Sequence, residues 1–481
     1  MGFPILGANT ESAAYEISNS LRFNDGDSTY LSRTTGSPTN EDMVTISAWI
    51  KRSTLSANHT LMSWDSGGGS QTYLRTFNSN DNFQLFNDTA GETDTSIIAS
   101  ADSRDVSAWY HLVLKYDAAQ STSSDRVKLY INGTEQSLGT ANYPPQNTAL
   151  GLNVGSRVVN IGRWAAGSEY VDGYVSEFAF IDGQALAPTS FAETDNNGVW
   201  IPKEFKDDVT FGNNGFYLEF KQTGTSANSS GIGADTSGND NHFAVNNLGA
   251  RNVVQDTPTN NFMTFNPLFT NSRGTFAEGN CQVTTNVQGS APYGQVEFGN
   301  FHVNSGKWYW EVEVVQVGSG GSLGLGMSER AYSNSYINGH NNGGSAGNVR
   351  YNNSSGAIVM GNAGSLGTGA TYTDGDTIMF AMDLDNSKFY TGKNGTWNNS
   401  QDPANGTNSF TLASQGDYGD FWTPWISKDD TNNNAKVYLN TGNPVIANDS
   451  GNADDNGYGD FEYDVPAGFY ALCTKNLAEY G

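Results

Sequence analysis

Two glutamates in the segment 307–314 have the spacing that carbohydrate chemistry uses. Glu311 and Glu313 are two residues apart, so a β-strand would place both carboxylates on one face. A retaining glycoside hydrolase needs two carboxyl groups about 5 Å apart that flank the glycosidic bond. The next residue on that face is Val315, followed by Gln316, so no third carboxylate continues the pattern. We therefore expect a solvated strand face here and reject catalysis at this pair.

Nucleophilic catalysis and zinc binding also lack the residue patterns that they require. The five histidines are His59, His111, His242, His302 and His340. None of them accompanies a Gly-x-Ser-x-Gly motif, and His111 falls in a strand pattern, where an ordinary cross-strand histidine is expected. The two cysteines, Cys281 and Cys473, form no Cys-x-x-Cys pair for zinc, and we expect two separate buried thiols. We predict that the protein is not an enzyme.

A segment rich in Asn and Gly carries side chains that suit sugar recognition. The candidate ligand-binding residues in and near it are Tyr332, Tyr336, His340, Arg350, Tyr351 and Trp397. Aromatic faces stack on sugar rings, Asn and Asp accept hydrogen bonds from hydroxyl groups, and long loops on a rigid scaffold commonly carry recognition. A disordered loop without a ligand is the alternative, and the sequence leaves both open.

Composition excludes several other classes of protein. Only 15% of the 481 residues are charged, and 50 Asp and Glu against 24 Lys and Arg give a net charge of −26. Nucleic-acid binding needs basic residues that displace counterions from phosphates, so we expect none, and an anionic membrane surface is equally unfavourable. No apolar run approaches the roughly 18 residues of a transmembrane helix, so we expect no membrane insertion. The 56 glycines indicate a turn-rich β protein.

Short alternating apolar runs predict two groups of strands. The first group comprises 44–50, 110–116, 127–131 and 174–181, and the second comprises 307–314, 377–384, 437–439 and 468–472. The predicted fold class is all-β, with two antiparallel β-sandwich (jelly-roll-like) domains joined by a small irregular bridge. The predicted boundaries are 1–20 for an N-terminal docking segment, 21–195 for the first sandwich, 196–275 for the bridge and 276–481 for the second sandwich.

The order of these segments resembles two known families. The segments 47–50, 109–117, 129–133 and 171–178 make the first sandwich similar to the laminin-G-like branch of the concanavalin A-like sandwiches. The segments 305–312, 324–326, 374–377 and 389–395 make the second similar to a SPRY domain. Laminin-G-like modules often bind calcium at one rim of the sandwich. The resemblance therefore implies Ca²⁺ as the one candidate cofactor, with the loop carboxylates Asp65, Asp172 and Asp182 as candidate ligands.

The combination of both domains resembles virion proteins of marine tailed phages, as do the segments 182–186, 195–203 and 256–260. This resemblance implies a structural virion protein, a tail fibre or similar appendage, that binds a host-surface glycan or receptor during adsorption. It implies synthesis in the host cytoplasm, a location on the tail or capsid surface, and a homo-oligomer, a trimer by analogy. The segment from Phe3 to Tyr15 is the expected contact with other virion proteins.

Two alternative functions remain open at this point. The first is a head or neck decoration that binds other virion proteins. The second is a polysaccharide depolymerase, for which Glu311 would be the residue to test.

Overall fold

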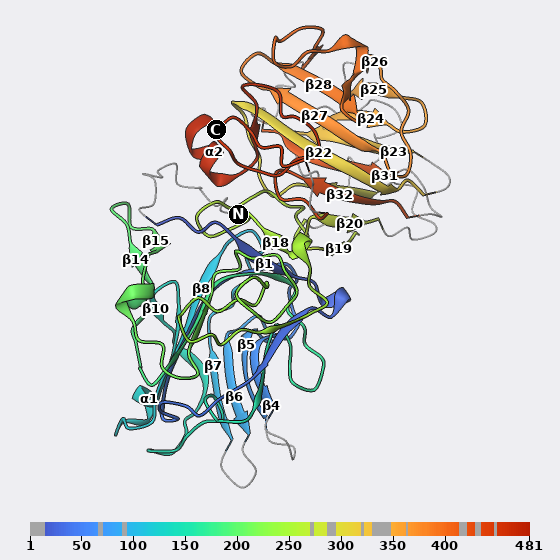
Figure 1. Ribbon diagram of the computed structural model, residues 1–481. Helices are drawn as coiled ribbons and strands as arrows, with labels where there is room; N and C mark the ends of the chain where they lie inside the picture. Colours follow the sequence, from blue (N-terminus) through green and yellow to red (C-terminus); the bar gives the residue numbers. More distant parts are fainter. Residues whose placement is uncertain are drawn as a thin grey trace. The chain divides into compact units, whose positions relative to one another are not determined.

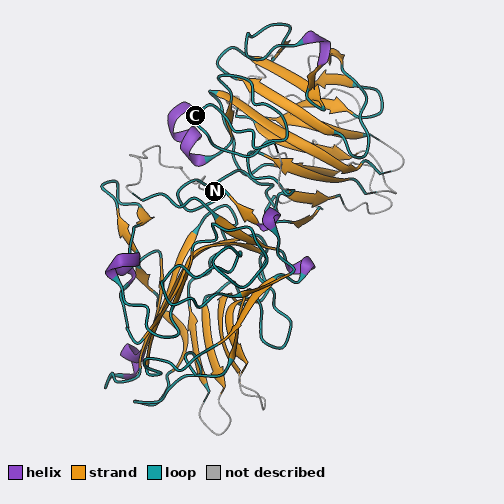
Figure 2. Cartoon of the chain, in the orientation of Figure 1, coloured by secondary structure: helices purple, strands orange, loops and turns teal. Residues whose placement is uncertain are grey.

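The chain folds as two compact units, with the boundary between Thr259 and Asn260. The computed structural model describes residues 15–65, 71–88, 94–269, 274–285, 295–318, 322–329, 348–361, 364–412, 421–428, 434–446 and 450–481. Strands dominate both units (Figures 1 and 2), which confirms the predicted all-β class. Within these described ranges, no helix is long and apolar enough to cross a membrane.

The N-terminal unit, described from Tyr15 to Thr259, contains two eight-stranded antiparallel sheets. The first sheet contains β10 (Thr134–Glu135), β9 (Val127–Ile131), β8 (Tyr110–Asp117), β3 (Met43–Arg52), β13 (Gly173–Asp182), β1 (Ser20–Phe23) and β18 (Val253–Val254) in that order, and β16 (Phe216–Leu218) also pairs with β13. The second sheet has the order β11 (Leu138–Asn142), β7 (Thr95–Ala99), β6 (Gln84–Asp88), β5 (Gln71–Phe77), β4 (His59–Asp65), β12 (Val158–Ile161), β2 (Tyr30–Thr34) and β17 (Ala244–Asn246). A separate hairpin pairs β14 (Ala192–Thr194) with β15 (Trp200–Pro202), and α1 spans Ser123–Arg126.

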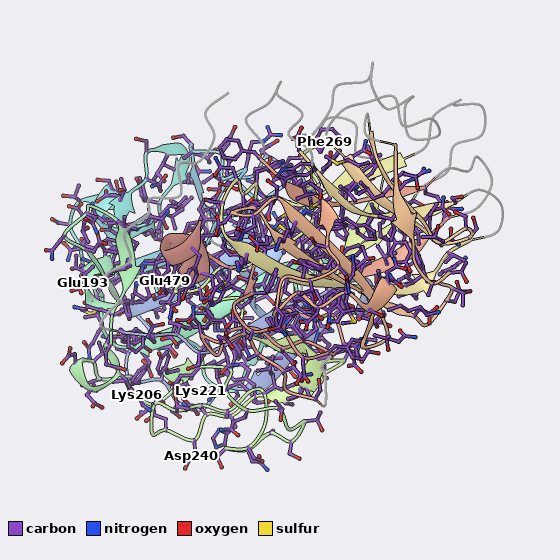
Figure 3. All side chains as sticks on the ribbon, turned by 90° about the horizontal axis from the view of Figure 1, so that it is seen from above. Glu193, Lys206, Lys221, Asp240, Phe269 and Glu479 are labelled. Carbon is purple, nitrogen blue, oxygen red and sulfur yellow. The ribbon has the colours of Figure 1, made fainter. Side chains whose placement is uncertain are left out.

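The segment that we predicted as a bridge, 196–275, is divided between the two units. Its larger part, 196–259, belongs to the N-terminal unit, because β16 pairs with β13, β17 with β2, and β18 with β1. The physical reason is apolar burial, since Phe216 and Phe243 are at most 1% exposed and lie in the core of the sandwich. Polar side chains of the same segment project at the surface, among them Lys206, Lys221 and Asp240 (Figure 3).

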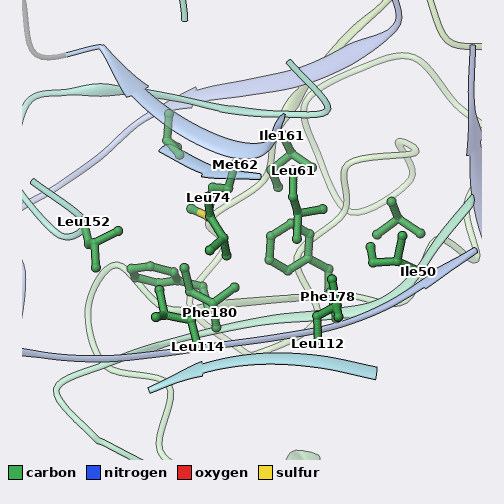
Figure 4. Packing of buried hydrophobic residues seen from close by; sticks show 14 of the residues in the cluster. Ile50, Leu61, Met62, Leu74, Leu112, Leu114, Leu152, Ile161, Phe178 and Phe180 are labelled. Atoms are coloured by element: carbon green, nitrogen blue, oxygen red, sulfur yellow. The ribbon is translucent and has the colours of Figure 1, made fainter. Parts of the chain in front are cut away.

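The core of the N-terminal unit lies between its two sheets. Val44, Ile46, Ala48 and Ile50 of β3 are at most 1% exposed and lie in this core, together with Leu112, Leu114 and Tyr116 of β8. Figure 4 shows the residues that meet across the core: Ile50, Leu112, Leu114, Phe178 and Phe180 from the first sheet, and Leu61, Met62, Leu74 and Ile161 from the second.

The C-terminal unit, Asn260–Gly481, contains a nine-stranded and a six-stranded sheet. The larger sheet has the order β19 (Thr275–Ala277), β20 (Gln282–Thr284), β32 (Lys436–Asn440), β22 (Lys307–Gln316), β27 (Thr377–Asp383), β28 (Lys388–Lys393) and β29 (Thr396–Trp397), with β30 (Phe410–Thr411) beside β28 and β33 (Tyr470–Ala471) parallel to β22. The smaller sheet has the order β21 (Gln295–Phe298), β31 (Thr423–Lys428), β23 (Leu323–Ser328), β24 (Asn348–Asn352), β25 (Ala357–Met360) and β26 (Gly364–Thr368). The chain ends in α2 (Thr474–Tyr480).

Strand β22 separates the core of this unit from a second, outer layer. Trp308, Trp310, Val312 and Val314 face the six-stranded sheet and are at most 2% exposed. The alternate residues point the other way, and Tyr309 packs with Phe461 in an apolar cluster on the outer face of the nine-stranded sheet. The two glutamates of β22 lie on this same outer face.

Candidate functional site

A pocket of about 350 Å³ opens on the outer face of the nine-stranded sheet. Its lining combines carboxylates, hydroxyl groups, one amide, one phenol and a short apolar stretch. The lining residues are Glu311, Glu313, Gly375, Thr377, Tyr438, Asn440, Pro444, Val445, Ile446, Ser450 and Glu462. Concave sites of this size and mixed polarity, at the low end of the range of about 300–1,000 Å³, are typical for small ligands.

Strand register brings the floor of the pocket together. Glu311 lies opposite Asn440, and Glu313 lies opposite Tyr438, across the pairing of β22 with β32. On the other side of β22, Glu313 lies opposite Thr377 of β27. Because directly opposite side chains in an antiparallel pair lie about 5 Å apart on one face, these residues form one continuous surface. The chain after β32 supplies the remaining wall.

Glu311 is not on a solvated face, and this prediction was wrong. The side chain is 1% exposed, and both carboxylate oxygens accept hydrogen bonds from the protein. Oε1 accepts from the Tyr309 hydroxyl at 2.8 Å and the Tyr463 amide at 2.9 Å, and Oε2 accepts from Asn440 Nδ2 at 3.2 Å and the Glu462 amide at 2.9 Å. Burial raises the pKa of Glu311 to about 7, although these donors act in the opposite direction. The loop that follows β32 therefore covers the glutamate.

Glu313 is the more accessible member of the pair. Its side chain is half-buried, and burial together with the nearby Glu462 carboxylate raises its pKa. Glu462 itself is exposed at the rim of the pocket. Two carboxylates that repel each other at the mouth of a pocket are strong hydrogen-bond acceptors for hydroxyl or ammonium groups of a ligand.

Hydrogen bonds within the protein limit what the Glu311 carboxyl group can do chemically. A general acid must hold its proton within hydrogen-bond reach of the leaving group. Four donors of the protein already occupy the two oxygens of Glu311, so this carboxyl group serves as an anchor for the loop. The groups with a free approach from the pocket are those of Glu313, Tyr438 and Glu462.

The predicted aromatic loop does not form a site within the described residues. Tyr332, Tyr336 and His340 lie outside the described residues. Tyr351 is fully buried in the core, where its ring packs edge-on against Tyr372 at 5.1 Å, so its proposed stacking on a sugar was wrong.

The other two members of the predicted loop site lie in different sheets. Arg350 is in β24 of the six-stranded sheet, and Trp397 is in β29 of the nine-stranded sheet. Trp397 packs edge-on against Tyr309 at 6.4 Å and is half-buried.

The three predicted calcium ligands are not brought together. Asp172 directly precedes the ten-residue strand β13 and Asp182 is its last residue, which places them roughly 30 Å apart, so they do not share an ion. Asp65 ends β4 in the other sheet. The described part of the chain holds no group of three His, Cys, Asp or Glu residues suited to a metal ion.

Asp182 has a structural role that accounts for its burial. Its Oδ1 accepts from the Asn40 amide at 3.0 Å and Asn153 Nδ2 at 2.6 Å, and its Oδ2 accepts from the Thr39 amide at 2.7 Å and the Asn214 amide at 2.9 Å. Four N–H donors occupy the directions from which a cation would have to bind. The carboxylate ties three loops to the end of β13.

One serine and one histidine lie side by side in the N-terminal unit. Ser47 Oγ is 2.8 Å from His111 Nε2, the spacing of a nucleophile and its base. However, Trp200 Nε1 donates to His111 Nδ1 at 3.1 Å, so the single proton of the neutral ring must be on Nε2, which then donates to Ser47. Burial lowers the pKa of His111 to about 3, which keeps the ring neutral. This pair is an ordinary buried contact, as predicted for His111.

Both cysteines are buried, free thiols, which confirms the expectation of two separate thiols. Burial raises the pKa of Cys473 to about 12, so it is not a nucleophile at neutral pH.

A second cluster, largely buried, combines aromatic and charged groups in the N-terminal unit. On the second sheet, the rings of Tyr73 and Phe86 stack at 5.0 Å, and Trp164 approaches Tyr73 edge-on at 6.4 Å. Arg75 lies over the Tyr73 ring and pairs with Glu169 at 2.5 Å. No sequence pattern identifies these residues, because Trp164 and Glu169 come from the loop after β12 and share no periodic signal with the strands.

Comparison with known proteins defines the class of fold. Residues 25–190 match the laminin G family model described as the concanavalin A-like lectin/glucanases superfamily. The N-terminal unit therefore has a concanavalin A-like fold. Among curated proteins, none matches the chain.

Parts of several solved structures are similar to parts of this chain, and SPRY domains are among them. The SPRY domain of human HERC1 has 19% sequence identity and a TM-score of 0.26, over 36% of this chain and 96% of that chain. A heptameric SAP-like pentraxin from Limulus polyphemus has 15% identity and a TM-score of 0.28, over 36% of this chain and 80% of that chain. Domain 4 of the arabinanase AbnA from Geobacillus stearothermophilus, in complex with arabinotriose, has 20% identity and a TM-score of 0.24, over 31% of this chain and 64% of that chain.

Proposed function

We propose that the protein is a non-enzymatic carbohydrate-binding appendage of a phage particle, which attaches the particle to a glycan on the host surface. The observation that carries the binding function is the pocket of about 350 Å³ on the outer face of the nine-stranded sheet. Glu313, Glu462 and Ser450 offer acceptors for sugar hydroxyl groups, and Tyr438 offers an aromatic surface. The concanavalin A-like fold of residues 25–190, which lie in the other unit, supports carbohydrate as a ligand of the protein and does not bear on this pocket.

The phage context of this proposal rests on the sequence resemblance alone. In that context the chain is part of a tail fibre or similar structure, and a homo-oligomer, a trimer by analogy, displays several copies of the pocket. The segment Phe3–Tyr15 would contact other virion proteins. Only its last residue is described, and Tyr15 donates a hydrogen bond from its hydroxyl to Glu177 at 2.9 Å.

One observation keeps the depolymerase alternative open to experiment. Glu311 has a pKa near 7 and lies two residues from Glu313, which is the combination that a retaining glycosidase would use for acid and nucleophile. We favour binding because the oxygens of Glu311 are occupied by donors from the protein.

The test is binding of the purified full-length protein to a panel of host-surface glycans, together with competition against phage adsorption. We expect saturable glycan binding, inhibition of adsorption and no release of reducing sugar. Glycan binding without inhibition of adsorption would support a head or neck decoration instead. Release of reducing sugar that Glu311→Gln abolishes would overturn the non-enzymatic proposal, and Glu479→Gln, on the surface of α2, is the control for folding.

A further inference from the structure

The lining of the pocket has more negatively charged than positively charged side chains. Three of its eleven lining residues are glutamates, Glu311, Glu313 and Glu462, and the described lining contains no Lys, Arg or His. A ligand that enters this space meets carboxylates on the floor and at the rim. A neutral ligand would leave the repulsion between Glu313 and Glu462 in place, whereas a cation would relieve it.

Lysines of the neighbouring strands have their own contacts. Lys393 Nζ lies 2.8 Å from Asp376 Oδ2 and 3.0 Å from the Thr371 carbonyl oxygen. Lys436 Nζ lies 5.4 Å from the centre of the Tyr438 ring, a cation–π distance. Each ammonium group is therefore already engaged by these neighbouring groups.

The pKa values of Glu311 and Glu313 agree with a cationic ligand in the pocket. Burial raises the pKa of Glu311 and of Glu313, and the Glu462 carboxylate adds to the rise at Glu313. A bound cation near Glu313 would lower both values again, because it stabilises the ionised carboxylates.

The shape of the pocket favours an organic cation over a metal ion. Val445, Pro444 and Ile446 form an apolar wall, and Ile446 is 48% exposed. A metal ion would make no use of this wall, and it would compete with four donors for the oxygens of Glu311. A molecule with an ammonium group and an apolar surface contacts the carboxylates and the apolar wall at the same time.

We infer that the ligand of this pocket is a saccharide that carries a free, positively charged amino group. The class of ligand, a saccharide, rests on the proposed function. The inference adds that this saccharide carries a positive charge. The ammonium group would donate to Glu313 and Glu462, the ring hydroxyl groups would reach Thr377 and Ser450 at the walls, and the apolar ring face would lie against Tyr438 or Ile446.

The test compares two probes that differ only in the charge of their amino groups. The full-length protein is titrated by calorimetry with the trisaccharide of glucosamine and with the trisaccharide of N-acetylglucosamine. We expect the amino form to bind at least about tenfold more tightly, a difference of about 1.4 kcal/mol. We also expect its affinity to fall about tenfold in Glu313→Gln and in Glu462→Gln, to fall with added salt, and to be unchanged in Glu479→Gln, whose side chain projects from α2 (Figure 3).

Four results would overturn the inference. Equal affinity for both trisaccharides, lost in Tyr438→Ala, would leave the proposed carbohydrate binding intact and remove the requirement for charge. Tight binding of the amino form that neither Glu313→Gln nor Glu462→Gln weakens would place its site elsewhere. Binding of Nα-acetylarginine amide as tight as that of the amino trisaccharide, with the same dependence on Glu313, would assign the pocket to a basic protein side chain. If no glycan of any kind binds, the proposed function fails together with the inference.

Discussion

Asn440 lies directly opposite Glu311 across β22 and β32 and joins the strand pair to the loop above it. Its Nδ2 donates to Glu311 Oε2 at 3.2 Å and to the Asp460 carbonyl oxygen at 2.9 Å. Glu311 in turn accepts from the amides of Glu462 and Tyr463. The wall of the pocket is thus held to the sheet by one buried carboxylate.

Glu311→Ala should destabilise the protein by about 3 kcal/mol, because it leaves four donors without their acceptor in a buried space. Glu313→Ala, on the same strand face and half-buried, should change the free energy of unfolding by less than about 1 kcal/mol. Urea denaturation of both variants measures the difference. Equal and small effects would show that the loop does not depend on Glu311.

Glu177 should make the stability of the protein depend on pH. It is 4% exposed at a bulge in β13, it accepts from the Tyr15 and Tyr217 hydroxyl groups, and burial raises its pKa from 4.5 to about 8. The folded protein therefore keeps this proton while the unfolded chain loses it. The stabilisation is complete below pH 4.5 and is lost as the pH rises towards 8, by up to about 1.4 kcal/mol per pH unit.

The matched variant for this effect is Glu177→Gln, which keeps the shape of the side chain and does not titrate. Its free energy of unfolding should fall less than that of the wild type between pH 5 and pH 8. Parallel curves for the two proteins across this interval would contradict the assignment to Glu177.

Ser47 should not react with a fluorophosphonate probe for serine nucleophiles. Trp200 donates to His111 Nδ1, so His111 Nε2 carries the proton and has no lone pair with which to activate Ser47. Mass spectrometry of the treated protein should find Ser47 unmodified. A phosphonylated Ser47 that is lost in His111→Ala would mean that the histidine acts as a base after all.

Removal of calcium should leave the melting temperature of the protein unchanged. Asp182, the most deeply buried of the three candidate ligands, is occupied by four N–H donors. Differential scanning calorimetry with added calcium and with EDTA measures the effect, and Asp182→Ala should lower the melting temperature equally in both. A calcium-dependent rise in the wild type that Asp182→Ala abolishes would restore the metal site.

The sequence allowed the fold class and the strand faces to be predicted because both depend on local alternation. Val44–Ile50 and Trp308–Val314 show the two-residue period of strands with one face in a core, and their apolar faces are buried. The opposite faces are covered as well, which the period does not predict: Thr45, Ser47 and Glu311 are at most 2% exposed. The three-residue strands β16 and β17 are too short for a period, so we assigned their segment to a separate bridge. Tyr351 was misplaced for a related reason, since the surrounding Asn and Gly residues concealed the pairing of β24 with β23 and β25.

The candidate site depends on contacts that the sequence does not encode locally. The spacing of Glu311 and Glu313 identified the strand face, but the burial of Glu311 depends on a loop about 150 residues further along the chain. Tyr438 and Asn440 follow from the alternation in β32, once its pairing with β22 is known. No pattern in the sequence connects Glu462 with this pocket.

The most direct test of the account is a crystal structure of the full-length protein with the glycan that binds it most tightly. We predict electron density for a sugar ring in the pocket, against Tyr438 and within hydrogen-bond distance of Glu313. A ring bound instead at Tyr73, Phe86 and Trp164 of the N-terminal unit, with the pocket empty, would contradict the account.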